Sequence, residues 1–150
     1  KSALNNYAAV MQNPTTKNVE KLAPEEYWQS IVDGEFSNYN DVDEVLEAFV
    51  ENLEEAVESL EEDYGDNIRF SFKIEKEKDV KSSVLDDAKD LLKENYDIPK
   101  KDIKKMVKLD VVATIKGSED EDEDETTMYA IQIGNNWYIC SESGYLLSFN

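Results

Sequence analysis

Apolar side chains recur at helical spacing in the first part of the chain. One stripe runs from Ala3 to Met11 and stops before Pro14, because proline disfavours helix in the residue that precedes it. A second stripe follows Pro24, which is favoured in a first helical turn, and stops at Gly34. The spacing therefore predicts two short helices before residue 35.

The longest stripe predicts a helix from Asp41 to about Gly65. Asp41 and Glu44 have the spacing of a capping box, in which each side chain bonds a free backbone N–H of the first turn. The apolar positions that follow keep a period of 3.6: Val42, Val45, Leu46, Phe49, Val50, Leu53, Ala56, Val57 and Leu60. The opposite face carries glutamates without a basic residue one turn away, which indicates a solvated face.

After residue 66 the hydrophobic positions recur at every second residue instead of with the helical period of 3.6. Ile68, Phe70, Phe72 and Ile74 alternate with polar residues and predict a half-buried strand. A helix with Ser82 or Ser83 as its cap should follow and end before Pro99.

From Met106 onward the pattern predicts an antiparallel meander. We expect strands at residues 107–115, 128–133 and 137–140, with a turn at Gly134, and a last strand from Tyr145 to Phe149. Helices first and antiparallel strands second indicate an α+β fold, in which helices cover one face of a sheet. We expect the strands after residue 66 to curl into a single sheet against the helix at residues 42–60. A length of 150 residues fits one domain over residues 1–150.

The charge balance restricts the partners. With 35 acidic and 16 basic residues, the formal net charge is −19, which repels phosphate backbones and anionic lipid. We therefore expect no nucleic-acid binding, and no apolar run is long enough for membrane insertion. Hydrophobic residues make up 40% of the chain, enough to predict a folded core.

The chain contains no histidine and a single cysteine, Cys140. Triads that depend on histidine and imidazole metal sites are excluded within this chain. No basic neighbour in sequence favours a Cys140 thiolate, so a buried, unreactive thiol is the preferred interpretation. We expect no cofactor.

Residues 119–125 form an unbroken acidic run from Glu119 to Glu125. Asp120, Asp122 and Asp124 have the alternating spacing of the start of an EF-hand loop. The match fails because Glu125 stands where that loop needs glycine, and Ile131 where it needs its bidentate glutamate. We expect a solvated hairpin loop without a metal.

Two segments resemble the nuclear transport factor 2-like superfamily. Residues 18–26 (NVEKLAPEE), which follow Tyr7 and Ala8, look like the N-terminal half of these domains, and residues 131–139 (IQIGNNWYI) are similar to their closing hairpin. The helix at residues 82–96 and the strand at 104–115 with its acidic loop resemble uncharacterised lipoprotein-type members from Firmicutes. The resemblance implies a cystatin-like α+β fold, in which a bent sheet is wrapped by helices into a cone with an apolar pocket. It also implies an extracellular chain, lipid-anchored through a segment upstream of Lys1.

Within such a cone, aromatic side chains would form a ligand-binding pocket. The alternative is that they belong to the core, as their helical and strand spacings favour. The six candidates are Tyr27, Trp28, Phe49, Phe70, Tyr129 and Trp137.

These observations predict a non-enzymatic accessory domain that binds a small apolar ligand or a protein partner. One alternative is a pocket enzyme of the isomerase or dehydratase type that uses an Asp/Glu–Tyr pair, although alternation places Lys73, Glu75 and Asp110 on the wet face of the strands. Another is a dimerisation module, although Arg69 and Ser71 make the outer face of the first strand polar. Monomer and homodimer both remain open.

Overall fold

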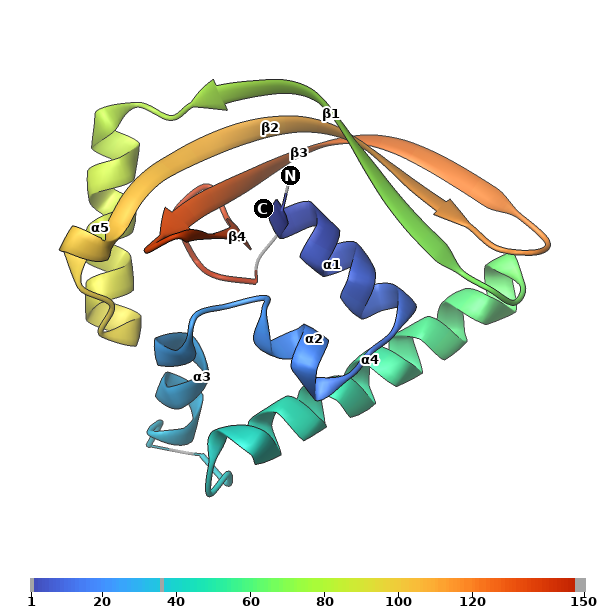
Figure 1. Cartoon of the computed structure of the whole chain (residues 1–150), viewed down its shortest axis with the longest axis horizontal. Helices are drawn as coiled ribbons and strands as arrows, with labels where there is room; N and C mark the ends of the chain where they lie inside the picture. The colour runs from blue at the N-terminus through green and yellow to red at the C-terminus, as the bar shows by residue number, and fades with distance from the viewer. Residues whose placement is uncertain (1, 36, 148–150) are drawn as a thin grey trace.

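The computed structural model describes residues 2–35 and 37–147 and has an α+β fold (Figure 1). Its helices are α1 (Ser2–Gln12), α2 (Thr16–Glu20), α3 (Glu25–Val32), α4 (Val42–Tyr64) and α5 (Ser82–Tyr96), with a 3₁₀ turn at Lys100–Asp102. Its strands are β1 (Arg69–Asp79), β2 (Ile103–Lys116), β3 (Glu121–Ile133) and β4 (Asn136–Cys140). The predicted order of helices followed by an antiparallel sheet is confirmed.

The four strands form an antiparallel meander in the order β1-β2-β3-β4. Register shifts occur in β1 between Ile74 and Lys76 and in β2 between Ile103 and Lys105, and the sheet is bent into an arch (Figure 1). Such bulges bend a strand and increase its local twist. The arch leaves a concave side, which determines where the helices pack.

Helices cover both faces of the sheet, where we had expected one. On the concave face, Ala3 and Leu4 of α1 pack against Val107 and Leu109 of β2. On the opposite face, Leu92 of α5 packs in a cluster that includes alternate residues of β2 and β3. Adjacent residues of β2, such as Met106 and Val107, are therefore both buried.

The long helix α4 begins after its predicted N-cap, Asp41, but the second bond of the predicted capping box goes to the residue before the cap. The Asp41 carboxylate accepts a hydrogen bond from the Glu44 N–H at 3.0 Å, while the Glu44 carboxylate accepts one from the Asn40 N–H at 2.9 Å. However, α4 packs against α2 and α3 rather than along the sheet, because α1 occupies the concave face (Figure 1). The expectation of the sheet curling against α4 is therefore wrong.

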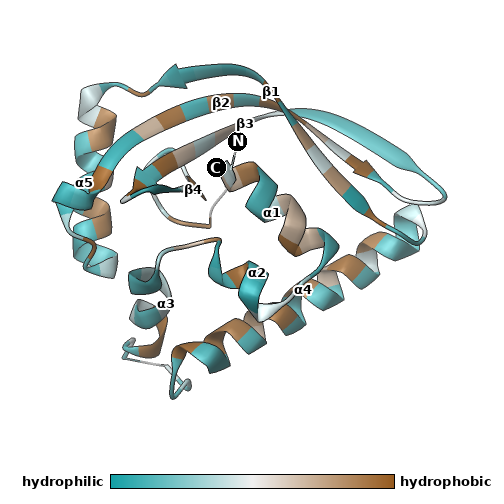
Figure 2. Ribbon diagram, in the orientation of Figure 1, coloured by the Kyte–Doolittle hydropathy of each residue, from teal (hydrophilic) through white to brown (hydrophobic). Residues whose placement is uncertain are grey.

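The acidic run is not a loop. Residues 121–125 are the first residues of β3 and pair with residues 112–116 of β2, so that the β2–β3 turn is confined to residues 117–120. Figure 2 shows this part of β3 as hydrophilic, while hydrophobic positions lie on the neighbouring strands. The apolar strand β2 supplies a pairing partner, which determines the structure of a segment that has no hydrophobic period of its own.

Three smaller expectations need correction. The N-cap of α5 is Lys81, so neither Ser82 nor Ser83 caps this helix. The polar stretch after Pro14 contains α2, which we did not predict. The strand expected from Tyr145 is reduced to a single bridge between Cys140 and Leu146, and the Phe149 end of that prediction lies outside the described residues.

No helix within the described residues combines the length and the apolar composition of a membrane span. Buried polar or charged side chains are also rare in this part of the chain. Ser141 is the one residue of this kind among the described positions.

Candidate functional site

The six aromatic residues proposed for a pocket are distributed over different parts of the structure. Tyr27, Trp28 and Phe49 lie together, with ring centroids 5.0 Å apart for Tyr27–Trp28 and 5.6 Å for Trp28–Phe49, both edge to face. Tyr129 packs with the buried cluster that includes Leu92 of α5, which we call the α5 cluster. Trp137 packs with the buried cluster that includes Leu4 of α1, which we call the α1 cluster. Phe70 lies on β1 opposite Ile115, so the six do not surround one cavity.

Trp28 fits the core interpretation. It is 1% exposed, and its indole N–H lies 3.2 Å from the Ala23 carbonyl and 3.3 Å from the Glu20 carbonyl. A buried indole N–H needs an acceptor, and here the connection between α2 and α3 supplies two. Trp28 therefore holds α3 against this connection and has no free donor to offer a ligand.

Trp28 and Trp137 do share one feature, a surface groove of about 840 Å³. One wall comes from α2, the α2–α3 connection, α3 and the start of α4, and the other from the start of α1 and the β3–β4 hairpin. Its lining residues are Ser2, Asn6, Lys17, Glu20, Lys21, Ala23, Pro24, Glu25, Trp28, Val42, Asn135, Asn136, Trp137 and Tyr138. The groove thus lies between the helical layer and the last hairpin of the sheet.

Trp137 is the distinctive side chain of this groove. It is half-buried and packs against the α1 cluster, which holds its ring in place. Its indole N–H makes no hydrogen bond with another residue of the described part, unlike that of Trp28. A positioned aromatic ring with a free donor is a typical anchoring group of a binding site.

Polar groups surround this ring. Tyr138 lies beside Trp137 on β4, and burial raises the pKa of its phenol, while a hydrogen bond with the Asn136 side chain acts in the opposite direction and the Glu26 charge adds to the rise. Lys17 and Lys21 stand on the helical wall together with Glu20 and Glu25. The groove therefore offers an apolar floor with amides and charges of both signs at its rim.

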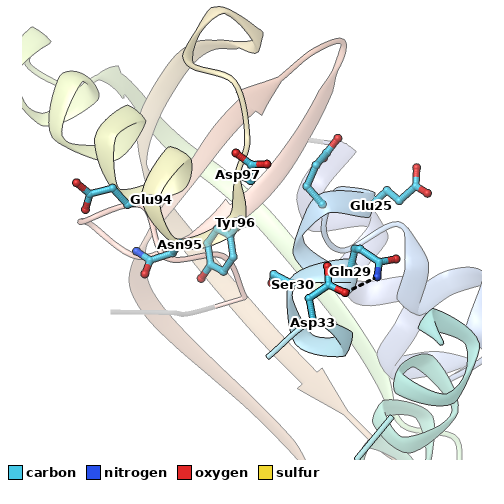
Figure 3. Close-up of a pocket in the computed structure, with 9 residues that line it drawn as sticks. Glu25, Gln29, Ser30, Asp33, Glu94, Asn95, Tyr96 and Asp97 are labelled. Carbon is cyan, nitrogen blue, oxygen red and sulfur yellow. Dashed lines mark hydrogen bonds between the residues drawn. The ribbon is translucent and has the colours of Figure 1, made fainter. Parts of the chain in front are cut away.

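A second cavity, of about 440 Å³, separates α3 from the end of α5 (Figure 3). Its lining is strongly acidic: Glu25, Glu26, Gln29, Ser30, Asp33, Glu94, Asn95, Tyr96 and Asp97. Figure 3 shows that the Glu25 and Glu94 side chains do not converge on a common point.

Several polar groups of this acidic cleft are already bonded within the protein. The Gln29 amide donates to Asp33 at 3.1 Å, the Ser30 hydroxyl donates to the Tyr27 carbonyl at 2.6 Å, and Lys93 bonds Asp97 at 3.0 Å. Among the described residues, no group of three or more acidic, cysteine or histidine side chains is arranged to hold a metal ion. The cleft is therefore less equipped for a ligand than the Trp137 groove.

Acid–base chemistry would need a carboxylate inside a cavity. Within residues 2–35 and 37–147, no Asp or Glu is buried. A tyrosine–carboxylate hydrogen bond joins Tyr64 to Asp122, with the oxygens 2.6 Å apart, but it lies exposed at the tip of the β2–β3 hairpin. Glu75 and Lys73 are exposed on β1 as predicted, and Asp110 is half-buried on β2.

Cys140 is 1% exposed in the cluster beneath α5, as the sequence indicated. Burial raises the pKa of its thiol to about 12. At neutral pH the thiol is therefore protonated and shielded, which is the state of an inert structural cysteine.

Comparison with known proteins gives no relative, since no family model, curated protein or solved structure matches this chain. Sequence reasoning identified Trp28 and Trp137 but missed the lysines and asparagines of the groove. The turn residues Asn135 and Asn136, directly before Trp137, were the available signal. Lys17 and Lys21 gave none, because α2, which carries Lys17 and ends directly before Lys21, was not predicted.

Proposed function

We propose that this protein is a non-enzymatic binding domain that accommodates an apolar or aromatic group in the Trp137 groove. The group belongs to a small ligand or to a side chain of a partner protein. The observation that carries this proposal is the half-buried Trp137 ring, held by the α1 cluster while its N–H has no acceptor among the described residues.

The size and composition of the groove support the proposal. Ligand sites typically have volumes of roughly 300–1,000 Å³ and combine an apolar lining with a few polar groups. The groove has a volume of about 840 Å³, with Pro24, Val42 and Trp137 beside Asn6 and Asn135. Its polar rim suits a ligand that has one apolar face and hydrogen-bonding groups at its edge.

The alternative enzyme of the isomerase or dehydratase type receives less support. It requires a carboxylate and a tyrosine within a cavity that excludes water. The acids of the described residues are exposed or half-buried, and the pair Tyr64–Asp122 lies far from the Trp137 groove along the sheet.

The placement of this domain outside the cell, anchored by a lipid, is part of the same proposal. Its support is the resemblance of residues 18–26 and 131–139 to nuclear transport factor 2-like lipoprotein-type sequences. A strongly acidic surface is compatible with this placement because it keeps the domain soluble and away from anionic lipid.

Binding of the apolar dye 1-anilinonaphthalene-8-sulfonate, followed by its fluorescence, provides a first test. Trp137→Ala should weaken binding about tenfold or more, as expected for an aromatic anchor. Tyr39→Ala is the matched control, because Tyr39 is an exposed aromatic outside the groove and its loss should leave binding unchanged. Circular dichroism verifies that both variants are folded. Equal binding by wild type and Trp137→Ala would exclude the groove.

A further inference from the structure

The first eight residues of strand β3 have an open edge. β3 extends over Glu121–Ile133, but β4 pairs with it only at residues 129–133. Residues 121–128 therefore have β2 on one side and no strand of the described chain on the other. No backbone hydrogen bond from another described element reaches this outer edge, which leaves a row of peptide groups available for pairing.

The side chains of this open edge are strongly acidic on both faces of the sheet. Every residue from 121 to 127 is exposed, and five of the seven are carboxylates. Successive residues point to opposite faces, so Asp122 and Asp124 lie on one face and Glu121, Glu123 and Glu125 on the other.

These charges have little compensation within the chain. Of the β2 residues that pair with the five carboxylates, Lys116 is the one basic residue. Neither this lysine nor any other described cation forms an ion pair with them. Acidic residues also have low β-propensity. In addition, carboxylates on the same face of the strand repel one another, and a cationic neighbour would relieve this repulsion.

We infer that residues 121–128 of β3 are a docking edge for a basic, extended segment of a partner protein. The segment adds to the sheet as a further strand, so backbone hydrogen bonds supply much of the affinity. Its lysines or arginines meet carboxylates on both faces of the sheet, and this charge complementarity supplies specificity. The inference is independent of the Trp137 groove, which lies at the β3–β4 end of the same sheet.

A second copy of this chain fits this edge less well. The edge strand on the far side of the sheet is β1, which after its bulge places Lys76 and Lys78 on one face but Glu77 and Asp79 on the other. One face of β1 would therefore set acidic residues against the acidic edge of β3. Two copies, each with a net charge of −19, would also repel one another.

The test uses the intact protein and a capped heptapeptide, Lys-Lys-Val-Lys-Lys-Val-Lys, which carries lysines on both faces of an extended strand. Isotope-edited NMR of the protein should show shifts at residues 121–128 and slower amide exchange there. A peptide of the same sequence, N-methylated at every backbone nitrogen, keeps its charge but cannot pair along either edge. It should bind at least tenfold more weakly.

Matched protein variants separate the edge from general electrostatics. The triple variant Glu121→Gln, Glu123→Gln, Glu125→Gln should weaken binding about tenfold. The triple variant Glu51→Gln, Glu55→Gln, Glu58→Gln removes the same charge from exposed positions of α4 and should change it less than twofold. Equal binding of both peptides, equal losses in both variants, or shifts outside residues 121–128 would each overturn the inference. Self-association without peptide through this edge, or identical shifts with Ca²⁺ alone, would also overturn it.

Discussion

The Tyr64 hydroxyl donates a hydrogen bond to the Asp122 carboxylate across 58 residues of sequence, with an oxygen–oxygen distance of 2.6 Å. It joins the C-terminal end of α4 to the acidic half of β3. The backbone supports the same junction, because the Glu119 N–H donates to the Tyr64 carbonyl at 2.9 Å. Through this junction α4, which otherwise packs on α2 and α3, is fixed to the sheet.

Removal of the Tyr64 hydroxyl should loosen the tip of the β2–β3 hairpin. Tyr64→Phe should lower Tm by roughly 1–3 °C, since one exposed hydrogen bond is lost, and should speed amide exchange in residues 117–125. Tyr39→Phe is the control, because its hydroxyl is in no hydrogen bond of the described residues. Unchanged exchange at the hairpin in Tyr64→Phe would show that the backbone contacts alone hold the junction.

The same hydrogen bond predicts a pH dependence at alkaline pH. The bond with Asp122 raises the pKa of Tyr64 to about 12, above the ordinary value of 10.0. A folded-state pKa that is raised means that the stabilisation is complete below pH 10 and is lost as the pH rises through 12. Ultraviolet titration should show a late-titrating phenol that is missing from Tyr64→Phe. Its ionisation near pH 10 would contradict the account.

Gly117 lies against the end of α4, where a Cβ would collide with the Tyr64 carbonyl oxygen. Gly117→Ala should therefore cost about 2–3 kcal/mol, because neither backbone segment can move aside without losing hydrogen bonds. Gly134→Ala provides the comparison, since the new Cβ meets nothing there and only the left-handed backbone (φ 64°) is strained, which costs about 1 kcal/mol. Urea unfolding of the two variants gives the difference. A smaller loss in Gly117→Ala than in Gly134→Ala would disprove the packing argument.

Cys140 should be unreactive in the native protein. Burial raises its pKa to about 12, so its contribution to stability is complete below about pH 9 and is lost between pH 9 and 12. At pH 8 a disulfide reagent should modify Cys140 of the native protein only as fast as the protein unfolds. In urea, where the protein is already unfolded, the modification should be immediate. Cys140→Ser should cost about 1–3 kcal/mol, because a hydroxyl is buried among apolar side chains. Rapid modification of the native protein would contradict this.

The helices show how much of the structure the local spacing of hydrophobic residues can predict. For α1, α3 and α4, a period of 3.6 and local stop or cap signals at Pro14, Gly34 and Asp41 gave both position and type. For α2 the pattern gave nothing, since a helix of five residues is too short to show a period.

The acidic run shows what local pattern cannot decide. Residues 121–125 are polar on both faces, so they carry no period of either kind. Their conformation depends on pairing with Val112 to Lys116 of β2 and on the anchor at Tyr64, both of which are contacts between distant segments. Sequence reasoning assigned them to a loop because it had no way to see these contacts.

The groove was predictable from the sequence only in part. Trp137 was identified from its place beside a tight turn, but the six aromatics were assigned to one pocket on the assumption of an open cone. The helix α1 fills the concave side of the sheet, so Phe70 and Tyr129 end on different sides of it. The sequence of no single segment indicates which helix occupies that side, because this depends on contacts between distant segments.

The most direct test of the central claim uses the two tryptophans as separate reporters. Incorporation of 5-fluorotryptophan gives two fluorine resonances, from Trp28 and Trp137, which Trp137→Phe assigns. On titration with small apolar aromatic compounds, the Trp137 resonance should shift in a saturable way while that of Trp28, which is 1% exposed, changes little. A Trp137 resonance that stays constant while other parts of the protein respond to the compounds would contradict the claim that this groove is the binding site.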